Sequence, residues 1–299
     1  MNDVVILTDE RLVAALMQAQ GGDWAGHEIT SVEEAEGERA MYRVGSDFAV
    51  RMPRHPDAVP LIEREARWLP HLSGLPLAMP SLRLRGEATP RFNWPFIVVD
   101  WIDGTEANES TVRDWSQEVA LLARFLRALW KRSLKGGPAA GAENRMRGVP
   151  LHQLTDTVLT EVGTLRDELD VSLTREVWMN ALEAAPPRKM RWLHGNLKAS
   201  NMIVREGKLA GVVDWGHVAV GDPAVDVAVA WRWVPELEMG SFQSALSAGD
   251  DLWRRARGWA LYDAVSTLGK YRGSNHPRHI IDCDDARCVI GRLGLGTSC

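Results

Sequence analysis

Residues able to do chemistry gather in one stretch of the chain, between positions 194 and 214. The segment His194–Asn201 reads HGNLKASN, and Asp214 follows it in the triplet Asp-Trp-Gly. The carboxylate of Asp214 and the side-chain carbonyl of Asn201 are oxygen ligands of the kind that Mg²⁺ prefers. Lys198 supplies a cation that could stabilise negative charge on a group in transfer. These residue types indicate a metal-assisted reaction site.

Taken together, the two segments resemble the catalytic and metal-binding loops of the aminoglycoside phosphotransferase family, which are kinase-like enzymes acting on small molecules. The family's catalytic loop reads H-G-D-x-x-x-x-N, and its metal loop is a short apolar strand ending in D-[FWI]-[GD]. Here both loops occur in that order, and the resemblance covers nearly the whole chain. It implies that Asn201 and Asp214 bind Mg²⁺, that Lys198 is catalytic, and that ATP or GTP is the cofactor. The alternative is a polar loop between strands with no chemical role.

One position departs from the family pattern, because Asn196 stands where the family has the aspartate that acts as general base. An amide can hold a hydroxyl group by hydrogen bonding, but it cannot accept the proton. General-base assistance of about 10²- to 10⁴-fold should therefore be missing, and we expect a poor enzyme. Either the aspartate was exchanged deliberately, which the intact remainder of the loop favours, or the chain is a natural pseudokinase.

The first half of the chain carries a candidate nucleotide site. Kinase-like folds place a cation on the third strand, where it holds the α and β phosphates and pairs with a glutamate on the next helix. Arg51 stands where lysine is usual, and arginine keeps the charge and can bind phosphate in a bidentate way. We expect its partner to be Glu65 rather than Glu63. The turn Ala35–Ala40 resembles the loop that covers the phosphates, although it holds a single glycine.

The base of the nucleotide should lie against the linker that follows the strand Phe96–Trp101. We expect the linker to contact the base at Val98, Asp100 and Ile102. Apolar contacts from the opposite side are expected at Ile203 and Val213. The linker side chains do not decide between adenine and guanine.

The acceptor molecule should lie against the helical half of the chain. Trp231 and Trp233 could form an apolar wall for it, and the alternative is that both are core residues. The stretch Arg51–Pro56 resembles the one after the third strand in macrolide phosphotransferases, which favours a hydroxyl of a macrolide or an aminoglycoside as the acceptor. A choline-, homoserine- or sugar-like metabolite remains an alternative, as does a catalytically dead regulatory protein that binds nucleotide.

Short strands and two helices are predicted before Gly104. Hydrophobic alternation and polar turns predict an antiparallel meander over residues 29–33, 40–44 and 48–52. A helix capped at Thr8 should precede it, and a helix over residues 60–72 should follow.

Beyond Gly104 the hydrophobic spacing is mainly helical. Helices are predicted over residues 115–130, 154–165, 250–272 and after Pro277, with brief strands over 190–193, 202–204 and 209–213. The resemblance implies a bilobal α+β fold of the protein-kinase type. We expect a nucleotide lobe over residues 1–97, a linker over 98–104 and a helical lobe over 105–299.

Composition places the chain among ordinary globular proteins. Of its 299 residues, 45% are apolar and 25% are charged, and no apolar run approaches the ~20 residues of a membrane span. The N-terminus carries no export signal, so a cytoplasmic location is expected. Residues up to Gly104 include 10 basic and 16 acidic side chains, which argues against a nucleic-acid groove. Neither a membrane nor an obligatory protein partner is expected.

Overall fold

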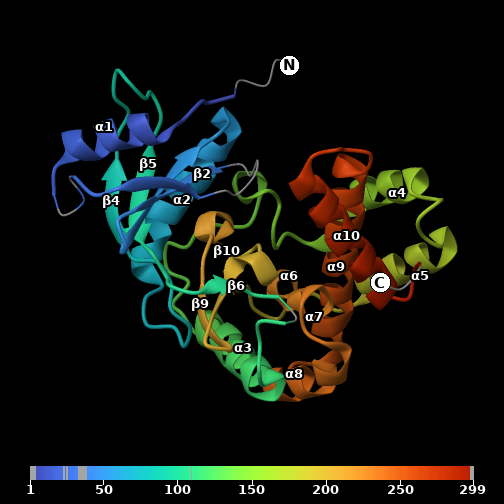
Figure 1. Ribbon diagram of the computed structural model, residues 1–299. Helices are drawn as coiled ribbons and strands as arrows, with labels where there is room; N and C mark the ends of the chain where they lie inside the picture. The colour runs from blue at the N-terminus through green and yellow to red at the C-terminus, as the bar shows by residue number, and fades with distance from the viewer. Residues whose placement is uncertain (1–4, 23, 25, 33–38, 109, 297–299) are drawn as a thin grey trace.

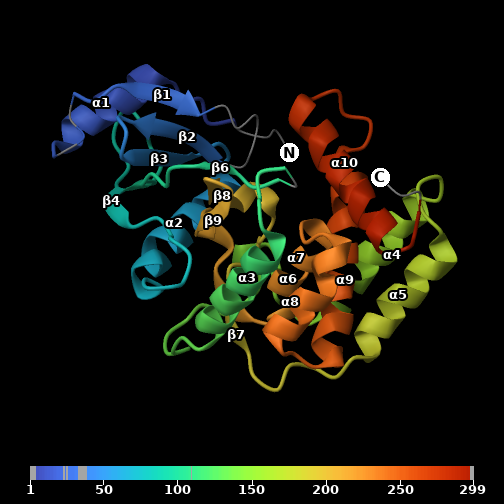
Figure 2. The same cartoon turned by 60° about the horizontal axis from the view of Figure 1, so that its bottom comes forward.

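The protein folds into two parts that differ in secondary structure. A computed structural model describes residues 5–22, 24, 26–32, 39–108 and 110–296. A sheet with two covering helices forms the N-terminal part, and a larger, mainly helical part follows it (Figure 1 and Figure 2). The arrangement confirms the predicted α+β class, with an N-terminal antiparallel sheet and a helical C-terminal part.

Five antiparallel strands form the N-terminal sheet, in the order β1-β2-β3-β5-β4. Their bounds are β1 Ile29–Val32, β2 Arg39–Val44, β3 Phe48–Pro53, β4 Leu82–Gly86 and β5 Phe96–Asp100. The first three strands are the predicted meander. Strand β4 was not predicted from the sequence, because its apolar residues alternate with arginines over only five positions.

The two faces of this sheet have different partners, as the two-residue period of a strand requires. Val50 of β3 and Val98 of β5 pack on the outer face with helix α1 (Glu10–Gln20). Ala49 and the neighbouring β5 residues Ile97 and Val99 belong to the core on the opposite face, together with side chains of helix α2 (Val59–Trp68). Arg51 shares the face of Ala49, so its side chain is directed toward α2.

The start of α1 differs from the prediction by one residue. Asp9, not Thr8, is the N-cap, since its carboxylate accepts a hydrogen bond of 2.7 Å from the backbone N–H of Leu12. The Thr8 hydroxyl instead accepts a hydrogen bond from Tyr42 on β2. The N-cap signal was present in the sequence but fits two adjacent polar residues equally well.

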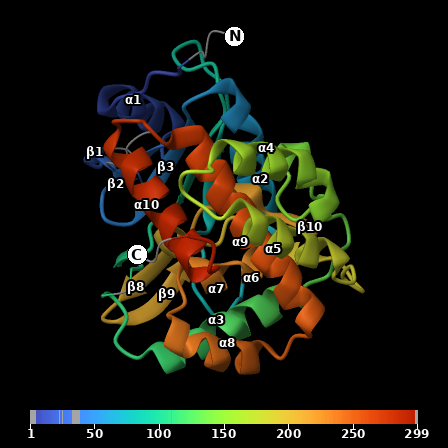
Figure 3. The same ribbon diagram turned by 90° about the vertical axis from the view of Figure 1, so that its right-hand side faces the viewer.

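The C-terminal part contains eight α-helices among the described residues. They are α3 Trp115–Trp130, α4 Thr155–Thr164, α5 Val171–Glu183, α6 Ala224–Val227, α7 Val229–Arg232, α8 Met239–Leu246, α9 Asp250–Tyr271 and α10 Pro277–Arg292. Figure 3 shows α10 lying along α9, with α4 and α5 beside them. The four long helices predicted from hydrophobic spacing are present, whereas α8 was not anticipated.

Short strands flank the two loops that carry the candidate catalytic and metal-binding residues. Their bounds are β6 Thr105–Glu106, β7 Arg191–Leu193, β8 Met202–Arg205, β9 Lys208–Val212 and β10 Ala219–Gly221. Strands β8 and β9 form the predicted hairpin, and both central turn residues, Glu206 and Gly207, have positive φ. The HGNLKASN segment begins directly after β7, which ends at Leu193. Asp214 lies two residues beyond the end of β9 at Val212.

One large hydrophobic core joins the two parts. It contains α2 and sheet residues together with side chains of α3, α5, α9 and α10. Within the described residues, no helix is long and apolar enough to cross a membrane.

Candidate active site

The loop after β7 is held in a fixed shape by a buried carboxylate. Asp226 accepts hydrogen bonds from the backbone N–H groups of His194 (2.7 Å) and Gly195 (2.8 Å). Gly195 has φ +82°, and a Cβ atom at this position would lie 2.5 Å from the carbonyl oxygen of His217. Glycine is therefore required here by both conformation and space. Asp226 therefore braces the loop that begins at His194.

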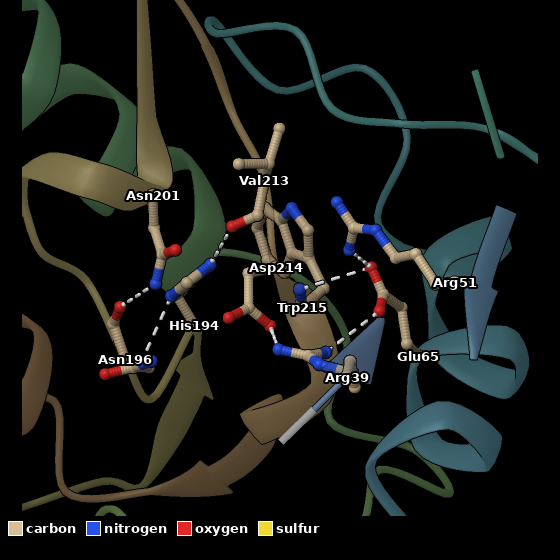
Figure 4. A network of polar contacts seen from close by, with 9 residues as sticks. All are labelled: Arg39, Arg51, Glu65, His194, Asn196, Asn201, Val213, Asp214 and Trp215. Atoms are coloured by element: carbon tan, nitrogen blue, oxygen red, sulfur yellow. Dashed lines mark hydrogen bonds and ion pairs between the residues drawn. The ribbon is translucent and has the colours of Figure 1, made fainter. Parts of the chain in front are cut away.

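His194 connects this loop with the segment that carries Asp214. Its ring is buried, and Nδ1 accepts a hydrogen bond from the backbone N–H of Asn196 at 3.3 Å. Since a neutral imidazole has one donor and one acceptor nitrogen, Nε2 is the nitrogen that donates to the Val213 carbonyl at 2.9 Å. Figure 4 shows this pair of contacts, which fixes the Asn196 backbone relative to Val213 and Asp214.

Asn201 lies at the end of a single 3₁₀ turn, and its amide is oriented by the same loop. The Nδ2 group donates to the carbonyl oxygen of Asn196 at 2.8 Å. The side-chain carbonyl oxygen consequently points away from that contact. The backbone carbonyl of Asn201 accepts from the N–H of Val213 at 2.9 Å, which ties the two loops together.

Asp214 occupies the residue position where the chain turns out of the β8–β9 hairpin. It has φ +66°, in the left-handed region that aspartate tolerates better than most residues. Burial acts to raise the pKa of its carboxyl, but the charges of Arg39 and Arg51 and a hydrogen bond from Arg39 outweigh burial and hold the pKa well below its ordinary value. The carboxylate stays ionised, as a metal ligand must.

The N-terminal sheet and helix α2 face the two loops and carry the predicted cation and its glutamate partner. Arg51 of β3 forms an ion pair with Glu65 of α2, whose side chain is fully buried. Glu65 also accepts from the backbone N–H of Trp215 at 3.3 Å. Glu63 instead faces solvent and pairs with Arg85. The choice of Glu65 over Glu63 agrees with this geometry.

Arg39 is a site residue that the sequence did not reveal. Its guanidinium forms ion pairs with both Asp214 and Glu65, so it lies between the two walls (Figure 4). The residue lies within the stretch Ala35–Ala40 expected to cover the phosphates, and the structure places Arg39 and Ala40 in β2 rather than in a turn. Most of that stretch, residues 35–38, lies outside the described residues.

These walls enclose a cavity of about 200 Å³ between the two parts of the protein. Seven predicted site residues line it: Arg51, Asp100, Asn201, Ile102, Ile203, Val213 and Asp214. Further lining residues that sequence reasoning missed are Val32, Arg39, Met41, Ala49, Pro80, Trp101, Gly104, Glu106 and Ser200. Glu65, which pairs with Arg51, does not line the cavity.

Val98 does not reach this cavity, and its prediction as a nucleotide contact is wrong. It is fully buried on the outer face of the sheet, where it packs with α1 residues. The error follows from strand alternation, because the residues of β5 that face α2 are the neighbours of Val98. The apolar run FIVVDW is buried on both faces, so its sequence shows no alternation that would tell the face toward α1 from the face toward α2.

Lys198 belongs to the HGNLKASN segment and interacts electrostatically with charged residues of helix α10. Burial lowers the pKa of its amine, Asp282 of α10 and Asp214 counteract this, and Arg278 and Arg232 add to the lowering. The charges acting on Lys198 therefore come from both sides of the reaction site. No ion pair to Lys198 occurs among the described residues.

The two tryptophans proposed for the acceptor wall have different environments. Trp233 is 2% exposed, and its ring packs 4.6 Å from that of Trp115 on α3. Trp233 is therefore a core residue, which was the alternative considered for it, and it offers no surface to an acceptor. Trp231 is partly buried and packs against Trp253 of α9.

Comparison with known proteins gives a consistent result over most of the chain. Residues 31–259 match the model of the phosphotransferase enzyme family. Viomycin phosphotransferase from Streptomyces vinaceus is 29% identical over 263 residues, covering 83% of this chain and 85% of that protein.

Solved structures also resemble the whole fold. The GDP complex of aminoglycoside 2'-phosphotransferase-IIIa superposes with a TM-score of 0.71 at 18% identity, covering 96% of this chain and 99% of the other. A macrolide 2'-phosphotransferase type I gives a TM-score of 0.63 at 19% identity, with coverage of 95% and 98%. With the family model spanning both walls of the cavity and both loops that line it, this chain belongs to the phosphotransferase enzyme family.

Proposed function

We propose that this chain transfers the γ-phosphoryl group of ATP or GTP to a hydroxyl group of a small molecule and uses Mg²⁺. One observation carries the proposal: residues of both parts of the fold line the same cavity. Arg51, which pairs with Glu65, comes from the sheet part, and Asn201 with Asp214 comes from the helical part. The first pair suits phosphate binding, and the second suits a divalent cation.

The two parts of the fold then have separate tasks. Residues 1–97 form the nucleotide lobe, residues 98–104 the linker, and residues 105–299 the lobe that holds the acceptor. Because β5 continues to Asp100, the first part of this linker is still sheet.

Asn201 and Asp214 fit a magnesium ion by their chemistry and orientation. Both offer oxygen atoms, and the amide nitrogen of Asn201 is already engaged with Asn196. When bound, Mg²⁺ would neutralise phosphate charge and draw electron density from the leaving group.

The remaining residues hold and orient the nucleotide and stabilise charge on the transferred group. The guanidinium of Arg51, fixed by Glu65, donates to phosphate oxygens, and Lys198 stabilises charge on the transferred group. The N–H groups of Asp100 and Trp101 already donate to Ser81 (3.0 Å) and Asp47 (2.8 Å). The base is therefore expected to bind the backbone of Ile102, between the side chains of Ile203 and Val213.

The acceptor hydroxyl binds at Asn196. Its side-chain amide accepts a hydrogen bond from the hydroxyl and orients the oxygen, but the proton must leave to solvent or to a phosphate oxygen because the amide cannot take it. Slow transfer with intact ligand binding is the expected result.

The acceptor itself is proposed to be an antibiotic of macrolide or aminoglycoside type. The relatives described above carry viomycin, aminoglycoside and macrolide in their names, which supports this class. Asp282 and Asp285 of α10 both interact electrostatically with Lys198. Carboxylates on that side favour an acceptor with a basic group over a neutral one.

The test is a transfer assay with a panel of hydroxyl-bearing compounds. Radiolabelled ATP and GTP are offered with macrolides, aminoglycosides, viomycin, homoserine and choline, and labelled product is separated by chromatography. The proposal predicts slow, Mg²⁺-dependent labelling of an antibiotic. Labelling of homoserine or choline alone would contradict the acceptor class but retain the reaction.

Asn196 favours one second candidate, a nucleotide-binding regulatory protein without catalysis. This candidate predicts that neither the present chain nor Asn196→Asp labels any acceptor. Asn180→Asp is a matched control, since it adds the same charge to an exposed residue of α5.

A further inference from the structure

Arg39 brings a second guanidinium into the cavity proposed to bind the nucleotide. It is the first residue of β2, and its side chain is 13% exposed. One terminal nitrogen lies 3.3 Å from Glu65, and the other pairs with Asp214. A Cβ atom added to Gly216 would approach an Arg39 nitrogen to 2.7 Å, so the glycine leaves room for this side chain.

Arg39 completes the hydrogen bonding of Glu65. The Oε1 atom of Glu65 accepts from Arg51 and from the N–H of Trp215, and its Oε2 atom accepts from Arg39. The other terminal nitrogen of Arg39 pairs with Asp214. Arg39 therefore joins a carboxylate of each part of the protein at the cavity wall.

Two arginines and two carboxylates pair at this wall, and the cavity lining also contains the acidic Asp100 and Glu106. Arg39 and Arg51 offset Glu65 and Asp214, and the base position holds the neutral Asn196. With an aspartate at position 196 and a neutral residue at 39, the same site would be two charges more negative. Phosphates approaching such a site would depend on divalent cations to overcome repulsion.

We propose that Arg39 is a phosphate-binding residue that admits nucleotide into the cavity without a divalent cation. This inference rests on the proposed function of the cavity. A guanidinium has five N–H donors in a planar fork, so Arg39 can keep a contact with Asp214 or Glu65 while it donates to a phosphate oxygen. Asp214 is then neutralised by Arg39 when metal is absent and is released to the metal when metal is present.

The test measures ADP and adenosine binding by isothermal titration calorimetry in EDTA and in Mg²⁺. The unmodified chain should bind ADP in EDTA. Arg39→Gln should weaken that binding at least about tenfold, because a charge-assisted hydrogen bond to phosphate is lost and Asp214 is left unneutralised. Adenosine affinity should stay within about twofold, since adenosine carries no phosphate.

Arg85→Gln is the matched control. Arg85 also lies on the N-terminal sheet and pairs with a glutamate of α2, but that pair, with Glu63, is exposed at the surface. This variant should bind ADP in EDTA as the unmodified chain does. Unchanged adenosine binding by Arg39→Gln shows that the cavity is still folded.

A second variant distinguishes a specific contact of Arg39 with phosphate from a general change in the charge of the cavity. Asp214→Asn should strengthen metal-free ADP binding, because Arg39 no longer shares its guanidinium with a carboxylate, while the gain from Mg²⁺ disappears. Adding Arg39→Gln to Asp214→Asn should remove that strengthening.

Two results would overturn the inference alone: ADP binding only in the presence of Mg²⁺, or equal ADP affinity in EDTA for the unmodified chain and Arg39→Gln. Failure to bind ADP or adenosine under either condition would overturn the proposed function together with it.

Discussion

At the scale of single residues, the site depends on charges that are buried and mutually compensated. Glu65 is fully buried and receives hydrogen bonds from Arg51, Arg39 and the backbone of Trp215. A buried carboxylate without such partners would be costly. Its role is to hold the guanidinium groups in place, and the guanidinium groups are what a phosphate would meet.

Replacing Arg51 by alanine should weaken ADP binding by about 10- to 100-fold, because the lost hydrogen bonds are to charged phosphate oxygens. Adenosine binding should fall far less. Calorimetry with both ligands measures the two effects, with Arg85→Ala as the control on an exposed ion pair. An equal loss for both ligands would indicate damage to the fold and contradict the phosphate contact.

His217 is a buried histidine in the turn that follows Asp214, and it should make the protein sensitive to acid. Burial lowers its pKa to about 3, against the pull of Asp214. Its Nδ1 has no hydrogen-bond partner among the described residues. Because the unfolded chain binds the proton more readily than the folded one, protonation favours unfolding between pH 6.5 and about pH 3.

His217→Asn should remove this part of the pH dependence. Between pH 7.5 and pH 5 the unmodified protein should lose about 1 to 2 kcal/mol of stability through this group, whereas the variant should lose correspondingly less. Urea unfolding at both pH values measures the difference. The same decrease in both proteins would contradict the assignment to His217.

Residue by residue, the loops could be predicted and their distant partners could not. The HGNLKASN segment and Asp214 lie within one short stretch, so their types and spacing are visible in the sequence. Arg39 and Asp214 are separated by 175 positions. Nothing in the local pattern around Arg39 identifies the carboxylate that it meets.

At the scale of secondary-structure elements, strand ends and tight turns determine where the reactive groups point. Strand β7 delivers His194 and Gly195 to the carboxylate of Asp226 at the start of α6. The β8–β9 hairpin delivers Asp214 to the other side of the same cavity. The hairpin was predictable from its turn residues, whereas Val98 was misassigned because a strand buried on both faces shows no alternation.

Gly195→Ala should destabilise the protein by about 1 to 3 kcal/mol and disturb the Asn196 backbone, because positive φ and the close His217 carbonyl both exclude a side chain. Gly163→Ala provides the contrast. Gly163 lies in α4 with open space around its Cβ position, so its replacement should stabilise by about 0.5 to 1 kcal/mol. Thermal unfolding of both variants tests this, and equal stability changes would contradict the account of the loop.

At the scale of the whole molecule, helix α9 organises the helical part around the active-site loops. Asp263 of α9 pairs with Arg147 and with Arg232 of α7. Arg232 in turn donates to the carbonyl of Leu197 within the catalytic segment, at 3.2 Å. A buried ionic cluster therefore connects the core to the loop.

Asp263→Asn should cost about 3 to 5 kcal/mol, because it leaves two poorly hydrated arginines without their anion. The exposed pair of Asp284 with Arg287 is a suitable comparison, and Asp284→Asn should change stability by less than about 1 kcal/mol. Denaturant titration measures both. A small effect at Asp263 would contradict the structural importance of the cluster.

The bilobal architecture was implied by the resemblance to a known family, and many of its individual helices and strands were predicted from long, regular patterns. Hydrophobic spacing marked the long helices, and polar turns marked the meander. The cluster at Asp263 and helix α8 could not be predicted, because they depend on which elements pack together after folding. The core status of Trp233 has the same cause, since its ring is covered by Trp115 from a helix more than a hundred residues earlier.

The central claim is that Asn196 occupies the position of a general base in a phosphotransferase whose other parts are intact. The most direct measurement is the rate of phosphoryl transfer by Asn196→Asp relative to the unmodified chain, with nucleotide and acceptor binding measured by calorimetry on both. Asn196→Asp should raise kcat by at least about 10²-fold, or roughly 2.7 kcal/mol of barrier, while both affinities change little. If the variant binds both ligands and transfers phosphate no faster, Asn196 is not at the base position and the catalytic interpretation of the loop is contradicted.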